Sequence, residues 1–487
     1  MKHARSALTL SIALLLLVVG SATVGQTAPL EVGPVPVGLP AQIVPIEPDT
    51  LVTSFPMIDH GKTKSKKDDQ TGVTQWRVVS KTGNCCENYL LATAMGRLMD
   101  MGGCYINYTD DLGETWSSVR PIEPMINGEG ALVGGMGGDV FGATWDLYTG
   151  DRLYAFKYDA ASDSWLYQEM PIHSPVYDRP WIGFVPGPVN APGGAAQYVT
   201  FVQGGTATKE PLFYSTDGLT YVPGSSPSVD EQASGATFEG PFEITAGDDF
   251  DWMQTTGLPF TPLGGGRALA QVGPSGWALF DGDAFEWQPY TLADGNRPAG
   301  LFQVDSAGRL HNVLPAAEGL VYRISADGGA TWKTLGLPIQ LPGARAYDFK
   351  VNLAAGVGVV AIHSPTPEGT DVDIVLKFDI RKDTPRLVRQ YQVGLGDTNA
   401  GAGLSVTPSI RFDFDSVAIL PDGRVAVSFL DSTTRANALR DGEVSGPALA
   451  IELETKLGKK LPPPAEEPPP PAGVTAPPKI PCVDQVP

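Results

Sequence analysis

Basic residues, cysteines and long apolar stretches are all scarce in this chain of 487 residues. It carries 34 Lys and Arg against 54 Asp and Glu, which gives a net charge of −20. Nucleic acids and anionic membrane surfaces would repel such a chain, so neither is expected as its main partner. No pattern of long amphipathic helices can be read between the apolar segments, and this excludes an α/β fold.

The most apolar run, Ala7 to Val19, is shorter than the roughly 18 to 20 residues that a membrane-spanning helix needs. Lys2 and Arg5 precede it, and small residues such as Ala28 follow it. This order is typical of a secretory signal peptide. We therefore expect residues 1–28 to be removed, no transmembrane span to remain, and the protein to be secreted or to reach a cell surface or periplasm.

Only four cysteines are present, Cys85, Cys86, Cys104 and Cys482. In an exported chain they predict disulfides, for which three pairings exist, and their spacing lacks the paired C-x-x-C of a zinc site. Adjacent cysteines rarely bond each other because the ring strains the peptide between them. We expect one of the first two to bond Cys104 and the other Cys482, beyond the Pro-rich tail of residues 456–487.

Glycine and proline, by contrast, are abundant, with 57 and 44 residues, and favour many short strands joined by tight turns. The clearest turn signal occurs twice, as TDDLGETW (109–116) and SADGGATW (325–332). In this [S/T]-x-D-x-G-x-T-W pattern, hydroxyl and carboxylate can bond the turn's own N–H groups, glycine takes a positive φ and the aromatic ring packs on a core. We call these two segments the clip turns. The pattern predicts structural roles for Asp111, Trp116, Asp327 and Trp332.

Weaker copies of the clip turn end at Trp165, Tyr221 and Trp287, and another begins at Lys377. Their spacing of roughly 45 to 65 residues, with four short alternating segments per unit, is typical of β-propeller blades. The sequence therefore predicts an all-β propeller of four-stranded antiparallel blades over residues 89–455. Units starting near residues 89, 136, 181, 237, 301, 349 and 416 predict seven blades, with six as the alternative because residues 237–291 are poorly patterned.

The last unit supplies only three strands, so the ring needs a fourth strand from the other end of the chain. The apolar segment Thr50 to Met57, within an N-terminal linker of residues 29–88, is the expected closing strand. The basic run at residues 62–69 is expected to be an exposed part of the same linker.

The order of strands in a blade assigns each connection to one of two faces. The clip turns and the tight turns at Ala307–Gly308 and Asp422–Gly423 are expected on one face. Second-to-third and blade-to-blade connections are expected on the other, and these are long. Long loops on a rigid scaffold usually carry binding, so this second face is the expected binding surface.

The clip turn resembles the Asp-box of sialidase-type (BNR) repeats, which occur on the blades of β-propellers and are structural there. Sialidases hold a substrate carboxylate with three arginines and use a Tyr activated by a Glu, with an Asp as acid/base. The resemblance covers most of residues 50–453. The chain lacks the R-I-P or R-L-P stretch that carries the family's first arginine, which favours a binding propeller over a sialidase-like, exo-acting glycoside hydrolase on an acidic sugar.

Several long loops deliver an arginine just before the innermost strand of a blade: Arg179, Arg297, Arg345 and Arg411. A guanidinium fork suits a carboxylate ligand. Alternatively, each arginine pairs with a neighbouring carboxylate, as Asp178, Asp348 and Asp413 would allow. Candidates for catalysis, if there is any, are Tyr347, Glu239 and Asp178.

No cofactor is expected. The acidic cluster Asp248–Trp252 could hold Ca²⁺ through oxygens, but it lacks the spacing and glycine of a calcium loop, so a solvated acidic loop is the expectation. The expected partner is a glycan or an extracellular or cell-surface protein.

Overall fold

The computed structural model describes residues 38–46, 49–55, 74–82, 89–102, 105–120, 127–146, 152–170, 178–205, 212–224, 244–245, 260–272, 276–295, 300–316, 319–337, 345–365, 371–393, 416–429 and 445–453. Within these ranges the chain forms β-strands, short turns and one 3₁₀ turn, η1 (Met136–Gly138), and no α-helix. The all-β prediction is confirmed.

The strands form seven antiparallel sheets, the blades of a propeller. Blade 1 comprises β5 (Tyr89–Ala92), β6 (Leu98–Gly102), β7 (Tyr105–Thr109) and β8 (Trp116–Arg120). Blade 2 comprises β9 (Asn127–Gly134), β10 (Val140–Asp146), β11 (Leu153–Asp159) and β12 (Ser164–Glu169). Blade 3 comprises β13 (Asp178–Ala191), β14 (Gly194–Gly205), β15 (Phe213–Ser215) and β16 (Val222–Pro223). Blade 4 comprises β18 (Phe260–Gly264), β19 (Arg267–Val272), β20 (Gly276–Asp281) and β21 (Glu286–Pro289). Blade 5 comprises β22 (Leu301–Val304), β23 (Leu310–Ala316), β24 (Gly319–Ser325) and β25 (Lys333–Gly336). Blade 6 comprises β26 (Arg345–Asn352), β27 (Val357–Pro365), β28 (Asp371–Asp379) and β29 (Arg386–Val393). Blade 7 comprises β30 (Val417–Ile419), β31 (Val425–Phe429), β32 (Ser445–Glu452) and β4 (Thr74–Thr82).

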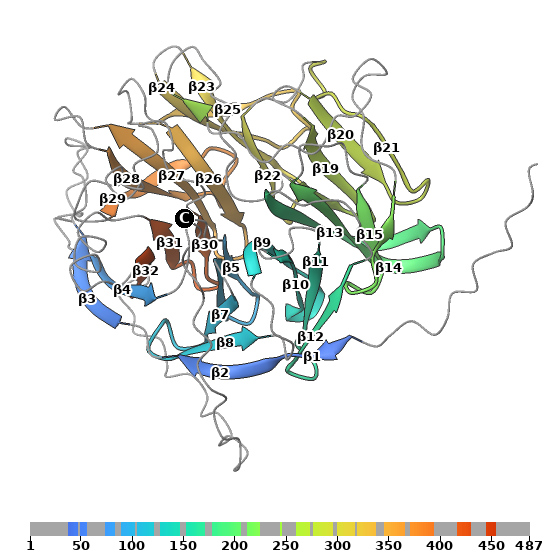
Figure 1. The fold of residues 1–487 in the computed structure, drawn as a ribbon. Helices are drawn as coiled ribbons and strands as arrows, with labels where there is room; N and C mark the ends of the chain where they lie inside the picture. The colour runs from blue at the N-terminus through green and yellow to red at the C-terminus, as the bar shows by residue number, and fades with distance from the viewer. Residues whose placement is uncertain are drawn as a thin grey trace, which may run out of the picture. The chain divides into compact units, whose positions relative to one another are not determined.

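The blades follow one another round a closed ring (Figure 1). Their innermost strands contact each other in the order β5, β9, β13, β18, β22, β26, β30 and back to β5. One hydrophobic cluster fills each of the seven interfaces between neighbouring blades. The ring therefore has seven blades, as predicted, and not six.

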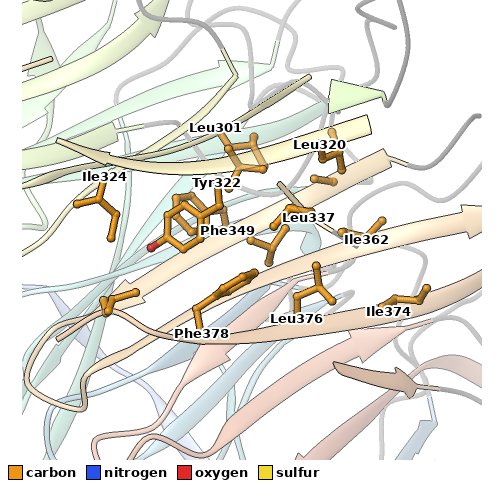
Figure 2. Close-up of a cluster of buried hydrophobic side chains, with 14 residues drawn as sticks. Leu301, Leu320, Tyr322, Ile324, Leu337, Phe349, Ile362, Ile374, Leu376 and Phe378 are labelled. Carbon is orange, nitrogen blue, oxygen red and sulfur yellow. The ribbon is translucent and has the colours of Figure 1, made fainter. Parts of the chain in front are cut away.

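The interface between blades 5 and 6 shows how these clusters are built (Figure 2). The ring of Tyr322 stands edge-on to Phe349 and Phe378, with centroids 5.2 and 4.9 Å away. Leucine and isoleucine side chains from both blades surround the three rings. Because edge-to-face rings and branched aliphatics fill the space between sheets, each blade is held by its neighbours as well as by its own ladders.

Burial explains why middle and outer strands differ in sequence. β11 (LYAFKYD) lies between two blades and is almost wholly buried, whereas β12 (SWLYQE), further out, alternates buried and half-exposed residues. Strands covered on both faces read as apolar runs, and strands covered on one face read as alternation.

The predicted closing strand was one strand too far out. The fourth strand of blade 7 is β4, which pairs with β32, and β3 (Asp49–Phe55) pairs with the outer side of β4 as a fifth strand. Two more N-terminal strands, β2 (Gln42–Ile46) and β1 (Leu39–Pro40), add fifth strands to blades 1 and 2. β1, β2 and β3 thus form an outer strap across three consecutive blades.

Blade 4 begins at Phe260, later than the predicted start near residue 237. Within the connection that precedes it, β17 (Ile244–Thr245) pairs with Ala346 and Arg345 of β26. This connection therefore leaves blade 3 and touches the innermost strand of blade 6 before it returns to blade 4.

Candidate functional site

The alternating strand directions sort the connections onto two faces. The tight-turn face carries the first-to-second and third-to-fourth turns of the blades, including both clip turns. The long-loop face carries the second-to-third and blade-to-blade connections. The starts of the innermost strands lie at the long-loop face, because the blade-to-blade connections lead into them.

The clip turn of blade 1 is closed by its own side chains. The Thr109 hydroxyl donates to Asp111 Oδ1 (2.8 Å) and accepts from the amide of Gly113 (2.8 Å). Asp111 accepts from the amide (2.8 Å) and hydroxyl (2.7 Å) of Thr115. Burial alone would raise the pKa of Asp111, but these bonds lower it below its ordinary value.

The clip turn of blade 5 repeats the same bonds. Ser325 donates to Asp327 Oδ1 (2.7 Å) and accepts from the Gly329 amide (2.8 Å). The amide and hydroxyl of Thr331 donate to Asp327 at 2.9 and 2.6 Å. The Thr331 bonds are the main reason that the pKa of Asp327 falls to about 2. Both carboxylates are thus engaged within their own turns, and neither is directed at a ligand.

Each clip turn ends on a tryptophan that packs inward. Trp116 is buried in the cluster between blades 7 and 1, and Trp332 packs against the cluster between blades 4 and 5. The guanidinium of Arg323 lies 4.0 Å from the centroid of the Trp332 ring. The glycine in the pattern takes φ 80° at Gly113 and 92° at Gly329, where a residue with a Cβ would be strained.

The tight-turn face is linked from blade to blade by hydrogen bonds that run in one direction round the ring. In blades 1 to 3, the third-to-fourth turn accepts a bond from the preceding blade. Arg77 donates to Leu112 O (2.6 Å), Arg97 to Asp163 (3.4 Å) and Lys157 to Asp217 O (2.9 Å). Arg97 also lies between the rings of Tyr108 and Tyr158, which adds cation–π attraction.

The links continue through blades 4 to 6. The side chain of Asn190 donates to Asp283 O (3.1 Å), and the amide of Ala293 donates to Gly328 O (3.0 Å). Arg309 donates to Ile380 O at 2.8 Å. All six blades that possess a third-to-fourth turn therefore receive a donor from the preceding blade or, at blade 5, from the described part of the connection that follows blade 4.

Blade 7 has no such turn, because its third and fourth strands come from opposite ends of the chain. Glu452, at the end of β32, stands in for it. Its carboxylate accepts from Lys377 Nζ (2.7 Å) and the Tyr391 hydroxyl (2.7 Å), both in blade 6, and from the Val425 amide (3.2 Å). Lys377 and Glu452 are 1% and 0% exposed. This is a Tyr–Glu pair, the residue types that a sialidase uses, but its burial keeps any substrate away.

We call the contacts of blade 7 with blades 6 and 1 the seam of the ring. A second polar cluster lies at its inner end. Asp348 of β26 accepts from the Val417 amide (2.8 Å) and the Ser416 hydroxyl (3.2 Å). Ser416 in turn accepts from the Leu90 amide of blade 1 (3.2 Å). Lys350 pairs with Asp348 at 3.0 Å. The innermost strands of blades 6, 7 and 1 are therefore joined through one carboxylate and one hydroxyl.

Lys350 also links two blades that are not adjacent. Its ammonium lies 5.6 Å from the ring centroid of Tyr89 in blade 1, across the short innermost strand of blade 7. Burial alone would lower the pKa of Lys350, but the Asp348 carboxylate raises it above the ordinary value. Lys350 therefore carries its positive charge at neutral pH. Asp348 is bonded both to Lys350 of its own strand and to blade 7.

The arginines predicted to line the long-loop face are placed in part. Arg179 lies at the second position of β13 and Arg345 at the first position of β26. These are the innermost strands of blades 3 and 6, so the two positions lie on different sides of the ring at the same face. Asp178 and Tyr347 belong to the same two strands, beside Arg179 and Arg345.

The remaining candidates lie outside the described residues. They are Glu239, Arg297, Arg411, the acidic cluster Asp248–Trp252 and the four cysteines. Among the residues that the structure does describe, no group of three or more His, Cys, Asp or Glu could hold a metal ion. In the same part of the chain, no helix is long and apolar enough to cross a membrane.

One buried network was not foreseen from the sequence. His311, which has no exposed surface, bonds the Asp305 carboxylate through Nε2 (2.9 Å) and the Tyr322 hydroxyl through Nδ1 (2.7 Å). Arg309 also donates to Asp305 (2.7 Å). Burial lowers the pKa of His311, so the ring is neutral, donating through Nε2 and accepting through Nδ1. The network fixes the first-to-second turn of blade 5, from which Arg309 donates to Ile380 O of blade 6.

These features define the class of the protein as a seven-bladed β-propeller. No family model matches the sequence, and no curated protein matches it either. Solved structures with a similar arrangement include "YCF48 bound to D1 peptide" (TM-score 0.40, 11% identity, covering 82% of this chain and 99% of that chain). The mitotic checkpoint complex also matches (0.40, 10%, 81% and 95%). So does the NanB sialidase of Streptococcus pneumoniae (0.32, 12%, 76% and 69%). At these scores the likeness adds nothing on function.

Proposed function

We propose that this chain is an exported binding propeller that recognises a glycan or a protein partner through its long-loop face. The observation that carries the proposal is how the polar groups of the tight-turn face are used. On the tight-turn face, charged and polar groups are used in bonds within turns and between neighbouring blades. A face whose donors and acceptors are already paired offers few groups to a partner.

The innermost strands β13 and β26 begin at the long-loop face, and their first residues include Arg179 and Arg345. β17 of the blade 3–4 connection pairs with Arg345 and Ala346. Guanidinium groups at the mouth of a ring suit carboxylates on a sugar or an acidic peptide. We also infer that the clip turns are Asp-boxes with a structural role.

The test is a binding screen on the full-length protein against an array of neutral, uronic-acid and sialic-acid glycans and acidic peptides. Arg179→Ala and Arg345→Ala should weaken binding of the best probe about tenfold or more, since bonds to charged groups are strong. Arg381→Ala is the matched control, because Arg381 is 64% exposed on the third-to-fourth turn of blade 6, and it should leave affinity unchanged. Equal binding by all three variants would refute the proposal.

The alternative, hydrolysis of an acidic sugar, is decided in the same preparation with a fluorogenic sialoside and uronic-acid glycosides. Turnover that Arg345→Ala abolishes would replace binding by catalysis. We also propose that residues 1–28 direct export and that Cys482 is held by a disulfide to Cys85 or Cys86. N-terminal sequencing and non-reducing peptide mapping test both, and a Cys85–Cys86 bridge or a free Cys482 thiol would overturn the pairing.

A further inference from the structure

We propose that Asp348 is a positioning residue for the long-loop face: it holds β26, the strand that begins at Arg345 and pairs with β17, in fixed register with the first residues of blades 7 and 1. The inference rests on the proposed function for its consequence, but its structural part can be tested without any ligand.

Asp348 lies on the face of β26 that is turned toward blade 7. Pairing with β27 matches Arg345 to His363, Asp348 to Ala361 and Lys350 to Val359, with a register shift between residues 346 and 348. Alternate residues of a strand share a face. Asp348 and Lys350 therefore share the face of the sheet toward blade 7, while Ala346 and Phe349 pack against blade 5. The shift moves Asp348 into register with Arg345.

The partners of Asp348 lie at the start of the innermost strand of blade 7. Ser416 and Val417 are the first described residues after the blade 6–7 connection, and Leu90 follows the blade 7–1 connection by two residues. Asp348 therefore bonds the points at which two long-loop connections enter the ring, one directly and one through the Ser416 hydroxyl. Its own strand receives the blade 5–6 connection at Arg345 and the blade 3–4 connection at β17.

Two connections of the long-loop face thus enter the ring at residues linked to the Asp348 carboxylate, and two more meet the first residues of its strand. The carboxylate is buried, and Asp348 is 5% exposed. A buried carboxylate that accepts several bonds fixes the groups around it, because any displacement leaves a charge or a donor unpaired. On the tight-turn face the links join only neighbouring blades through turns. Asp348 is different because its bonds reach three consecutive innermost strands on the side where a ligand would enter.

The first experiment measures hydrogen exchange of single amides in the full-length protein by mass spectrometry. Ser416→Ala removes the acceptor of the Leu90 amide but leaves the bond from the Val417 amide to Asp348. Exchange at Leu90 should rise about tenfold or more, as expected for a lost buried bond, while Val417 stays protected. General destabilisation would instead speed both amides together and would overturn the inference.

Ser428→Ala is the matched control. Ser428 is also buried in blade 7, and its hydroxyl accepts from the Ser416 amide, so its bonds stay inside the blade. This variant should speed exchange at Ser416 and leave Leu90 unchanged. If Ser428→Ala also frees Leu90, the link from blade 7 to blade 1 is not specific and the inference fails.

Asp348→Ala should free both Val417 and Leu90, whereas Asp348→Asn keeps an acceptor for Val417 and should restore its protection to within about threefold of the wild type. A failure of asparagine to rescue Val417 would contradict the proposed bond. These outcomes need no ligand, so they separate the anchoring role from the proposed function.

The second experiment uses the best probe from the glycan and peptide screen. Asp348→Ala should weaken its binding about tenfold, and Asp348→Asn less. Asp305→Ala, which removes a buried carboxylate on the tight-turn face, is the control and should change affinity less than twofold at a comparable loss of stability. Equal losses for the two alanine variants would refute positioning. If the wild type binds no probe, the proposed function fails, and the exchange pattern still decides whether Asp348 anchors the three strands.

Discussion

Removing the Glu452 carboxylate should destabilise the ring more than removing any exposed ion pair. Glu452→Ala leaves the ammonium of Lys377 buried without its partner at 2.7 Å, and the Tyr391 hydroxyl without its acceptor. Breaking a buried ion pair from one side costs about 3–5 kcal/mol, because a charge is left in a poorly solvated place. The free energy of unfolding, from urea titration followed by tryptophan fluorescence, should fall by this amount.

Arg386→Ala is the control for this prediction. Arg386 is 69% exposed and pairs with Asp379 at 3.2 Å. An exposed pair of this kind contributes only about 0–1 kcal/mol. Trp76 packs edge-on against Tyr391, with ring centroids 5.1 Å apart, so its fluorescence should report loosening at the seam in Glu452→Ala but not in Arg386→Ala.

A pH series separates the charge effect from simple loss of packing. In the folded protein burial lowers the pKa of Lys377, and Glu452 offsets part of this. In Glu452→Gln the offset is lost, so the folded pKa falls further below the unfolded value. The unfolded state then binds more protons, and stability rises with pH from the folded pKa of Lys377 up to its ordinary value near about 10.4. The slope should be steeper than in the wild type. Parallel pH curves, or equal losses in Glu452→Ala and Arg386→Ala, would refute the argument that an unpaired charge is the cause.

Four further substitutions test other parts of the ring. Thr331→Val should raise the pKa of Asp327 from about 2 toward its ordinary value, as an NMR titration would show, and an unchanged pKa would contradict the bond. Bonds from His311 and Arg309 lower the pKa of Asp305 despite its burial, so the stability that Asp305 contributes is present above the ordinary carboxyl pKa and is lost as pH falls. Asp305→Asn should therefore reduce the loss of stability on acidification. An unchanged slope of stability against pH in acid urea titrations would count against this prediction. Gly308→Ala should cost about 1 kcal/mol for its positive φ alone, and Gly329→Ala clearly more in the same titration, because a Cβ there would meet Leu292 of blade 4 at 2.8 Å.

The number of blades could be predicted from sequence because its signals are local. The clip turns and their weaker copies mark third-to-fourth turns, and alternation marks the strands beside them, so a short window reveals each unit. The fourth blade was placed too early because the connection before Phe260 contains no clip turn to fix its start. Burial of β11-like strands on both faces gives apolar runs, which the same windows also detect.

The closing strand was misplaced because two segments compete for it with similar patterns. DTLVTSF (β3) is the more apolar, whereas TQWRVVSKT (β4) carries Arg77 and Lys81 and follows a basic run. In the structure β4 is the one with strands on both sides, and Trp76 and Val79 enter the clusters on its two faces. Its charges are accommodated because Arg77 reaches the next blade. A bond between Arg77 and the neighbouring blade can be recognised only once the arrangement of the blades in the ring is known.

The polar links were invisible for a related reason: their partners are far apart in sequence. Lys377 and Glu452 are separated by 75 positions and Leu90 and Ser416 by 326, so no periodicity connects them. The hydrogen bonds between turns and neighbouring blades explain why blade 7 uses side-chain carboxylates as acceptors. Six blades offer a turn carbonyl or carboxylate that a donor from before that blade in the ring can reach, and such a turn exists wherever the third and fourth strands are continuous in sequence. At blade 7 continuity is broken, and side chains must supply both the outer acceptor, Glu452, and the inner one, Asp348. A propeller closed by strands from both ends therefore needs buried carboxylates where blade 7 meets its neighbours, and substitutions of Glu452 or Asp348 should loosen the closure of the ring.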